Sequence, residues 1–230
     1  MKAILLCAGK GTRLKPITNY IPKCLVPING QPLLDIWLTK LEKLKINKIY
    51  INTHHLNDQV EKFVKNHKLK SRITLVYEKR LLNTAGTLNK LLDDVIDQEC
   101  LLIHADNYCQ DDLSLLIKTH RNRPNNCFMT MMLFKTKEPS KCGIVKLNKD
   151  NVVTNYYEKK KKFNGNIANG AIYVLSKEFL LSYKQKFNNA KNFSEHVIPL
   201  CMNKIYTYLT KKLFIDIGTP KKYKEVLNLK

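Results

Sequence analysis

The sequence alternates short apolar runs with longer stretches in which apolar residues recur every three or four positions. The first pattern is typical of a strand buried on both faces, and the second is typical of a helix that packs through one side. We therefore expect strands over residues 2–7, 48–52, 73–77, 101–103 and 127–134, and helices over residues 32–44, 56–64, 85–96 and from Asp111 or Asp112 to about His120. This alternation predicts a mostly parallel sheet covered by helices on both faces.

Beyond about residue 140 the pattern changes, because short strands follow one another with few helices between them. We expect strands over residues 143–147, 152–154, 171–174 and 212–217, and helices over residues 177–187, 193–202 and from Pro220 onward. The predicted fold class is α/β: a three-layer αβα sandwich with a Rossmann-like, mostly parallel sheet and a small mixed or antiparallel extension. We find no repeat and no low-complexity linker, so we predict one domain over residues 1–230, with halves at 1–140 and 141–230.

A loop of unusual composition follows the first predicted strand. It reads AGKGTRLKPIT, residues 8–18, and PKCLVP comes soon after it. Gly9 and Gly11 would let backbone N–H groups approach an anion, while Arg13 and Lys23 add positive charge. Since ligands of open α/β sheets bind beyond the carboxyl ends of the strands, the loop suits a polyphosphate. The alternative is an ordinary glycine turn with surface cations, because neither GxxxxGK[ST] nor GxGxxG is present.

Composition narrows the class of protein without fixing its function. The 230 residues are 44% hydrophobic, and the seven cysteines show no CxxC spacing, which favours a reducing compartment and a cytoplasmic protein. No apolar run approaches the roughly 20 residues that span a bilayer, so we expect no membrane association. The formal charge of +21 raises the possibility of a nucleic-acid partner. The lysines are spread along the chain, however, and solvated helix surfaces explain them without a specific nucleic acid.

Several motifs together resemble those of the sugar-1-phosphate nucleotidylyltransferases, also called nucleotide-sugar pyrophosphorylases. They are LLCAGKGTRLKPIT with PKCLVPINGQPLL, EKRLLNTAGTL (78–88), HADNY (104–108), YYEKK (156–160), NGAIYV (169–174), NFSEHVIP (192–199) and DIGTP (216–220). They occur in family order and cover nearly the whole chain. The chain looks most like the short mannose- or heptose-1-phosphate guanylyltransferases.

The resemblance implies transfer of a nucleotidyl group from an NTP to a sugar 1-phosphate, with release of pyrophosphate and with Mg²⁺ as cofactor. It implies four catalytic residues, Arg13, Lys23, Asp106 and Asp216, of which the two aspartates would hold the metal. It implies NTP binding in the first half by Ala8, Gly9, Gly11, Thr12, Glu78, Thr84, Ala85 and Gly86. It implies sugar-phosphate binding in the second half by Gly143, Glu158, Lys159, Asn169 and Gly170.

Several alternatives stay open at this point. Glu78 can match guanine through two hydrogen bonds, so GTP is favoured, but a uridylyltransferase for an N-acetylmuramate-1-phosphate-like sugar is the competing possibility. Asn83 stands where many relatives have glycine, and asparagine tolerates the positive φ that such a turn needs. A nicotinamide-dependent oxidoreductase lacks support, because no third glycine follows Gly11. Monomer and dimer are both compatible with the sequence.

Overall fold

The computed structural model describes residues 1–159 and 165–228. The chain forms two compact units, which we describe separately. Unit 1 comprises residues 1–81, 103–111 and 212–230, and unit 2 comprises residues 82–102 and 112–211. This division does not coincide with the expected halves at residue 140, because the chain returns to unit 1 twice after leaving it. Among the described residues, no helix has both the length and the apolar character needed to cross a bilayer.

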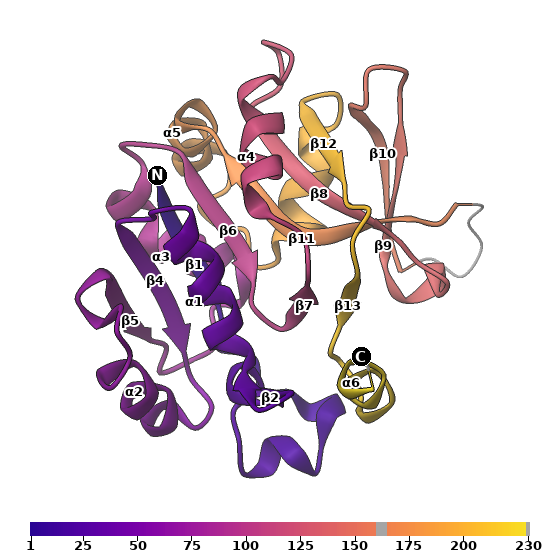
Figure 1. The fold of residues 1–230 in the computed structure, drawn as a ribbon. Coiled ribbons are helices and arrows are strands. Elements are labelled where there is room, and N and C mark those ends of the chain that lie inside the picture. Colours follow the sequence, from indigo (N-terminus) through magenta and orange to yellow (C-terminus); the bar gives the residue numbers. More distant parts are fainter. Residues whose placement is uncertain (160–164, 229–230) are drawn as a thin grey trace. The chain divides into compact units, whose positions relative to one another are not determined.

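Unit 1 is built on parallel strands. β1 (Lys2–Leu6), β4 (Lys48–Thr53) and β5 (Ile73–Tyr77) lie side by side in Figure 1 and pair in parallel, with Leu5 opposite Ile51 and Ile51 opposite Leu75. Ala3, Ile4 and Leu5 have no exposed surface, as expected for a strand covered on both faces.

Short elements and three helices complete unit 1. They are η1 (Thr12–Leu14), η2 (Ile17–Asn19), η3 (Lys23–Leu25), β2 (Pro27–Ile28), β3 (Gln31–Pro32), α1 (Leu33–Lys43), α2 (Asn57–Lys65), η4 (Lys70–Arg72), β7 (Asn107–Cys109), β13 (Phe214–Asp216) and α6 (Pro220–Leu227). The apolar side of α1 is buried, and the indole N–H of Trp37 donates to the carbonyl of Asn107 at 3.0 Å. This bond ties the segment that carries Asp106 to a core helix. The strand β6 (Cys100–His104) runs across the division between the units.

Unit 2 is built mainly on antiparallel strands. Its elements are α3 (Asn83–Val95), α4 (Leu113–Arg121), β8 (Met129–Lys135), η5 (Pro139–Lys141), β9 (Gly143–Leu147), β10 (Val153–Glu158), β11 (Ile167–Leu175), α5 (Lys177–Lys186), the π-helix η6 (Phe193–Val197), the 3₁₀ helix η7 (Ile198–Cys201) and β12 (Ile205–Leu209). β9 pairs with β10 and β11, and β8 pairs with β11, all antiparallel, whereas β12 joins β8 in parallel. Aromatic rings of Tyr173, Phe179, Tyr183 and Phe193 pack against one another and are fully buried.

The predicted fold class is confirmed, and most predicted elements are present. Asp112 caps α4 by accepting from the N–H of Ser114 at 2.9 Å, and Asn83 has the expected positive φ of 60°. Four short strands were missed, β2, β3, β7 and β12, and β11 is longer than expected. The helix expected over residues 193–202 is a π-helix followed by a 3₁₀ helix, because Pro199 has no N–H for a regular α-helical bond.

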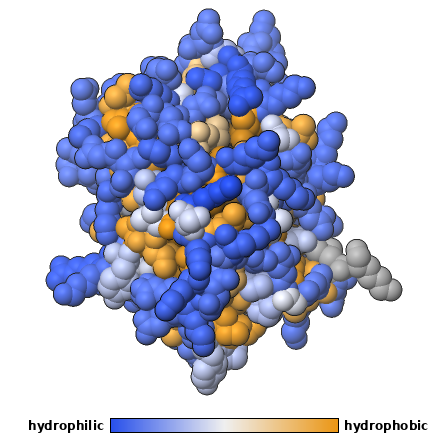
Figure 2. All heavy atoms as spheres, turned by 60° about the vertical axis from the view of Figure 1, so that its left-hand side comes forward, coloured by the Kyte–Doolittle hydropathy of each residue, from blue (hydrophilic) through white to orange (hydrophobic). Residues whose placement is uncertain are grey.

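Part of the positive charge lies at the C-terminal ends of the helices. Basic residues occupy the last turn of five helices: Lys40 and Lys43 in α1, Lys62 and Lys65 in α2, Lys118 and Arg121 in α4, Lys184 and Lys186 in α5, and Lys224 in α6. Cations at this end complement the partial negative charge of the helix dipole. Figure 2 shows hydrophilic side chains over most of the face in view. Part of the charge of +21 therefore has a local structural explanation.

We predict that the stability of the protein depends on pH through His120. This side chain has no exposed surface, and its Nδ1 lies 2.8 Å from Oγ1 of Thr130. Burial lowers the pKa of His120, and this outweighs the opposing effect of Glu99, whose Oε1 lies 3.5 Å from Nε2 of His120. The unfolded chain therefore takes up the proton first, so the free energy of unfolding should fall as the pH drops below about 6.5, by at most about 1.4 kcal/mol per pH unit.

Urea unfolding at a series of pH values between 7.5 and 5.5 measures this dependence. The variant His120→Gln should show a flatter dependence than the wild type over the same range, because glutamine does not titrate. Equal slopes for the two proteins would contradict the assignment.

Candidate functional site

Internal hydrogen bonds hold the loop after β1, and part of the loop is exposed to solvent. The N–H of Cys7 donates to Oδ1 of Asn52 at 2.6 Å, which ties the end of β1 to the end of β4. Gly11 has a positive φ of 62°, and its carbonyl accepts from the N–H of Leu14 and from the hydroxyl of Thr18, both at 2.8 Å. Ala8 is buried, whereas Gly9, Thr12 and Arg13 reach the surface. The backbone at Gly9 is therefore exposed to solvent, while hydrogen bonds hold both ends of the loop.

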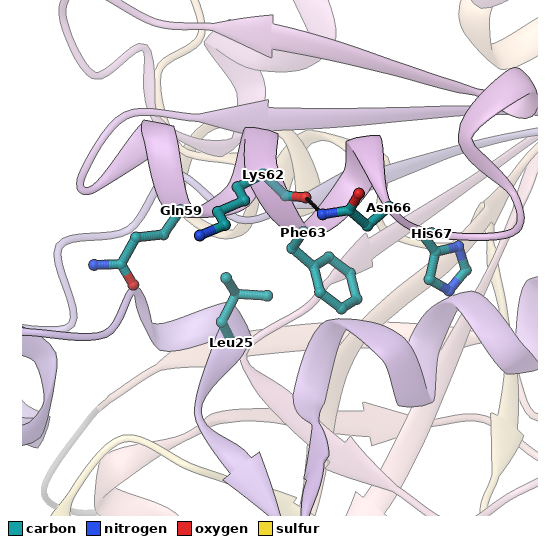
Figure 3. A pocket seen from close by; sticks show the side chains of 6 residues that line it. All are labelled: Leu25, Gln59, Lys62, Phe63, Asn66 and His67. Carbon is teal, nitrogen blue, oxygen red and sulfur yellow. Dashed lines mark hydrogen bonds between the residues drawn. The ribbon is translucent and has the colours of Figure 1, made fainter.

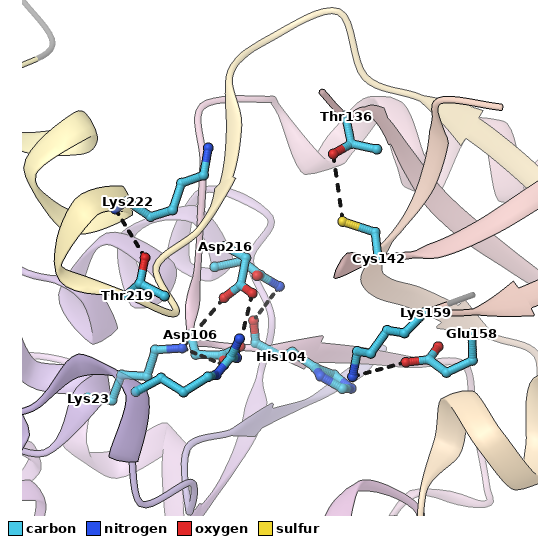
Figure 4. A network of polar contacts seen from close by, with 12 residues as sticks. Lys23, His104, Asp106, Thr136, Cys142, Glu158, Lys159, Asp216, Thr219 and Lys222 are labelled. Atoms are coloured by element: carbon cyan, nitrogen blue, oxygen red, sulfur yellow. Dashed lines mark hydrogen bonds and ion pairs between the residues drawn. The ribbon is translucent and has the colours of Figure 1, made fainter. Parts of the chain in front are cut away.

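Four charged side chains gather beside this loop in unit 1. Nζ of Lys23 lies 2.7 Å from Oδ2 of Asp106 and 3.6 Å from Oδ1 of Asp216. Nη2 of Arg13 lies 3.9 Å from Oδ2 of Asp216. The side chain of Lys23 is only 8% exposed, whereas those of Asp106 and Asp216 are 42% and 49% exposed. Figure 4 shows Lys23 between the two carboxylates.

Backbone pairing brings the two aspartates together from distant parts of the chain. Asp106 follows β6, where the N–H of Ala105 donates to the carbonyl of Leu6 at 3.2 Å. Asp216 ends β13, which pairs antiparallel with β7 so that Asp216 lies opposite Asn107. The N–H of Ile217 then donates to the carbonyl of Asp106 at 3.3 Å. The positions of both carboxylates are therefore fixed by main-chain hydrogen bonds.

The two carboxyl groups respond oppositely to their surroundings. Desolvation raises the pKa of Asp106. The opposing effects are larger in sum: they are the charges of Lys23 and His104 and the hydrogen bond from Lys23. The pKa of Asp106 therefore lies below its usual value. Desolvation and the negative charge of Asp106 raise the pKa of Asp216 above the usual value, against the opposing effects of Lys23 and Arg13. The two negative groups are thus close enough to repel each other, even though water reaches the outer side of each.

This pair of carboxylates fits a hard divalent cation. Mutual repulsion is relieved when a cation is shared, and Mg²⁺ is commonly held by one or two carboxylates together with water and phosphate oxygens. Within residues 1–159 and 165–228, no group of three or more His, Cys, Asp or Glu side chains is placed to hold a metal ion.

Glu78 lies in a buried hydrogen-bond network of unit 1. Glu78 is only 2% exposed, and its Oε1 accepts a hydrogen bond from Nδ2 of Asn52 at 2.9 Å. Asn52 also accepts from the N–H of Cys7, so one amide links Glu78 to the start of the glycine loop. The sequence pointed to Glu78 but not to Asn52. The available signal for Asn52 was its place as a polar residue directly after the apolar run of β4.

Thr84, Ala85 and Gly86 lie in the first turn of α3 in unit 2. The N–H groups of Ala85 and Gly86 donate to the carbonyl of Lys191 at 2.8 and 3.3 Å, and Oγ1 of Thr84 accepts from the N–H of Phe193 at 2.8 Å. These groups therefore hold the segment before η6. Their predicted part in NTP binding stays a prediction.

The residues predicted to bind a sugar phosphate gather on three strands of unit 2. Gly143 on β9 lies opposite Glu158 on β10, and Asn169 and Gly170 lie on β11. Nζ of Lys159 is 3.1 Å from Oε1 of Glu158, a contact that Figure 4 also shows. The hydroxyl of Tyr156 donates to Oε2 of Glu158. Sequence analysis missed Tyr156, although its position two residues before Glu158 on a strand places it on the same face.

Unit 1 also contains a hollow between α2 and η3, shown in Figure 3. It measures about 530 Å³ and is lined by Leu25, Gln59, Lys62, Phe63, Asn66 and His67. Leu25 and Phe63 give it an apolar floor, and no residue of the predicted site lines it. Leu25 belongs to the same short helix as Lys23.

Comparison with known proteins extends these findings. The profile of the family described as Nucleotidyl transferase matches residues 2–229. A Sulfolobus acidocaldarius protein, provisionally named a mannose-1-phosphate guanyltransferase, is 31% identical over 98% of this chain, and this chain spans only 62% of its length. The Campylobacter jejuni D-glycero-alpha-D-manno-heptose 1-phosphate guanylyltransferase is 29% identical over 97% of both chains.

Solved structures share the fold. The crystal structure of HddC from Yersinia pseudotuberculosis, a complex with GMP-PN, aligns with a TM-score of 0.80 and covers 98% of this chain and 97% of that chain. The two sequences are 23% identical. This similarity agrees with a mostly parallel α/β sheet carrying helices.

We predict that the two loop glycines differ in their tolerance of a side chain. A Cβ on Gly11 would lie 2.7 Å from Cγ2 of Thr18 and 3.3 Å from Cβ of Lys23, at a φ of +62°. A Cβ on Gly9 would meet nothing within 4 Å. Gly11→Ala should therefore lower the free energy of unfolding by about 1–3 kcal/mol, whereas Gly9→Ala should change it by less than about 0.5 kcal/mol.

Urea unfolding of both variants beside the wild type measures the difference, and Gly9→Ala is the matched control. Equal stability of the two variants would show that the turn at Gly11 is not constrained as described.

Proposed function

Since the chain belongs to the Nucleotidyl transferase family, we propose that it transfers a nucleotidyl group from an NTP to a sugar 1-phosphate, releasing pyrophosphate and forming an NDP-sugar. The observation that carries this proposal is the placement of Lys23 between Asp106 and Asp216 beside the glycine loop. GTP with mannose 1-phosphate or heptose 1-phosphate is the favoured substrate pair, since relatives named for these reactions match nearly the whole chain.

The reaction joins two anions, so its barrier depends mainly on charge. An oxygen of the sugar phosphate attacks the α-phosphorus of the NTP, and the bond to pyrophosphate breaks. The nucleophile is already ionised and needs no general base. Arg13 and Lys23 neutralise the triphosphate and the charge that grows on the leaving pyrophosphate, and the exposed backbone of the glycine loop contacts phosphate oxygens.

Asp106 and Asp216 are the residues that would hold Mg²⁺. When bound, the ion polarises the phosphate and neutralises developing negative charge. The carboxylates themselves orient the site, because main-chain bonds fix both of them and Lys23 holds them at a defined separation.

Unit 2 supplies the groups suited to the sugar phosphate. The ammonium of Lys159 can pair with the phosphate, while the carboxylate of Glu158 accepts hydrogen bonds from sugar hydroxyls. Asn169 offers an amide on β11, next to Gly170, the other residue expected to line the sugar site. The resemblance to the family implies these roles, and the gathering of the residues on β9, β10 and β11, with Lys159 directly after β10, supports them.

The identity of the nucleotide base is less constrained by the observed contacts than the reaction is. Glu78 could accept from N1–H and N2–H₂ of guanine, a pairing that uracil does not offer. Its carboxylate already accepts from Asn52, so guanine would share it with that amide. A uridylyltransferase for an N-acetylmuramate-1-phosphate-like sugar is the alternative.

A thermal-shift panel tests the choice of base. The protein with Mg²⁺ is heated with GTP, UTP, dTTP, CTP or ATP, and binding to the folded state raises the midpoint. We expect GTP to give the largest shift. A larger shift with UTP would favour the uridylyltransferase instead.

We predict that Asp106→Asn and Asp216→Asn each lower pyrophosphate release by at least about a hundredfold, because each removes a charge from the proposed metal site. Release is measured with Mg²⁺, GTP and a panel of sugar 1-phosphates. Circular dichroism should show an unchanged fold in both variants.

The exposed Asp58 on α2 provides the matched control, because Asp58→Asn makes the same chemical change away from the site. It should retain full activity. An active double variant of Asp106 and Asp216 would refute the metal assignment, and absence of release by the wild type with every substrate pair would refute the proposed reaction.

A further inference from the structure

Tyr156 lies on the same face of β10 as Glu158. Side chains two residues apart on a strand point to the same side, whereas Tyr157 between them points to the other side. On β9, Gly143 lies directly opposite Glu158 in the antiparallel register. A side chain at position 143 would therefore also stand on this face.

The ring of Tyr156 occupies the space above Gly143. A Cβ built on Gly143 would lie 2.0 Å from the hydroxyl oxygen of Tyr156, 2.6 Å from Cζ and 2.8 Å from Cε2. The hydroxyl and ring atoms of Tyr156 exclude such a contact, so with the ring in this place the position requires glycine for reasons of space. The absence of a side chain lets the tyrosine ring lie across β9 and reach Glu158.

The hydroxyl of Tyr156 is part of a hydrogen-bond chain. It donates to Oε2 of Glu158, while Nζ of Lys159 contacts Oε1 at 3.1 Å. Next to this pair, Nδ2 of Asn169 donates to the hydroxyl of Tyr173 at 2.7 Å. Asn169 is fixed in turn, because its Oδ1 accepts from the N–H of Ala171 at 2.8 Å.

The phenol of Tyr156 remains protonated under working conditions. Burial, together with the nearby Tyr173 and Glu158, raises the pKa of Tyr156 far above its usual value. A permanently protonated phenol is a reliable donor to a carboxylate. The geometry thus supplies a neutral donor on one oxygen of Glu158 and a cation on the other.

We propose that Tyr156 is a positioning residue for the sugar 1-phosphate, which acts by fixing the carboxylate of Glu158 through their hydrogen bond. This inference rests on the proposed function. An ionised carboxylate has about four acceptor directions, of which Tyr156 and Lys159 occupy two. Fixing the plane of the carboxylate directs the remaining acceptor positions and so determines which arrangement of sugar hydroxyls is bound.

The variant Tyr156→Phe tests this role, because it keeps the ring over Gly143 and removes only the hydroxyl. We expect the KM for the sugar 1-phosphate to rise about tenfold or more, as hydrogen bonds to charged groups contribute that much. The KM for the NTP and kcat should stay within about twofold, because binding of one substrate is lost equally in the ground and transition states. The matched control is Tyr157→Phe on the opposite face of β10, which should change neither KM.

Introducing Tyr156→Phe into the variant Glu158→Ala distinguishes an effect of Tyr156 that acts through Glu158 from a direct contact between Tyr156 and the sugar. In Glu158→Ala, adding Tyr156→Phe should change the KM for the sugar 1-phosphate by less than about twofold, since the group to be positioned is gone. A full additional tenfold rise would overturn the proposal. So would an unchanged KM in Tyr156→Phe, or an equal rise for both substrates.

A stability measurement tests the packing without any activity assay. Gly143→Ala should destabilise the wild type more than it destabilises Tyr156→Ala, in which the ring is absent. Equal losses would contradict the described contact. If the wild type turned over no substrate pair, the proposed function would fail, whereas a failed Tyr156→Phe test on an active wild type would overturn only the role of Tyr156.

Discussion

The site of unit 1 depends on one mostly buried ammonium group. Lys23 lies between Asp106 and Asp216, and its contact with Asp106 is shorter than either contact that Asp216 makes with a cation. Its own position is set by η3, which directly follows the glycine loop, while β7 and β13 set the positions of the aspartates. Arg13 of the glycine loop and Lys23 of η3 therefore both contact the carboxylate pair.

The sequence predicted the regular parts of the fold well, because their patterns are strong. The apolar runs of β1 and β4 and the periodic spacing in α1 allow few alternatives. The segment 193–202 was wrongly predicted as one helix, because apolar spacing does not reveal that Pro199 interrupts the backbone bonds. The short strand β7 was missed because three residues show no period, and β12, Ile205–Leu209, was missed although its alternating residues favour a strand.

The charged groups of the site were easier to find than the residues that hold them. Arg13, Lys23, Asp106 and Asp216 stand in distinctive motifs, and the structure brings them together, although their roles stay predictions. Asn52 and Tyr156 lie within ordinary-looking strands. Their importance depends on register, since Asn52 reaches Cys7 and Glu78, and Tyr156 reaches Glu158 across a glycine. Strand register is set by packing between distant segments, which one sequence does not display.

Glu78 and Glu158 differ from Asp106 and Asp216 in accepting a hydrogen bond from a neutral side chain, and this difference matches the chemistry proposed for each. Asp106 and Asp216 contact cations, as suits groups that must coexist with one another beside phosphates. Glu78 accepts from the neutral amide of Asn52, and Glu158 accepts from the neutral phenol of Tyr156 as well as from Lys159. A neutral donor fixes the direction of a carboxylate without cancelling its charge, so the carboxylate remains a strong acceptor. That property is what recognition of a base edge or a sugar hydroxyl requires, and Asn52 is itself anchored by the hydrogen bond from the N–H of Cys7.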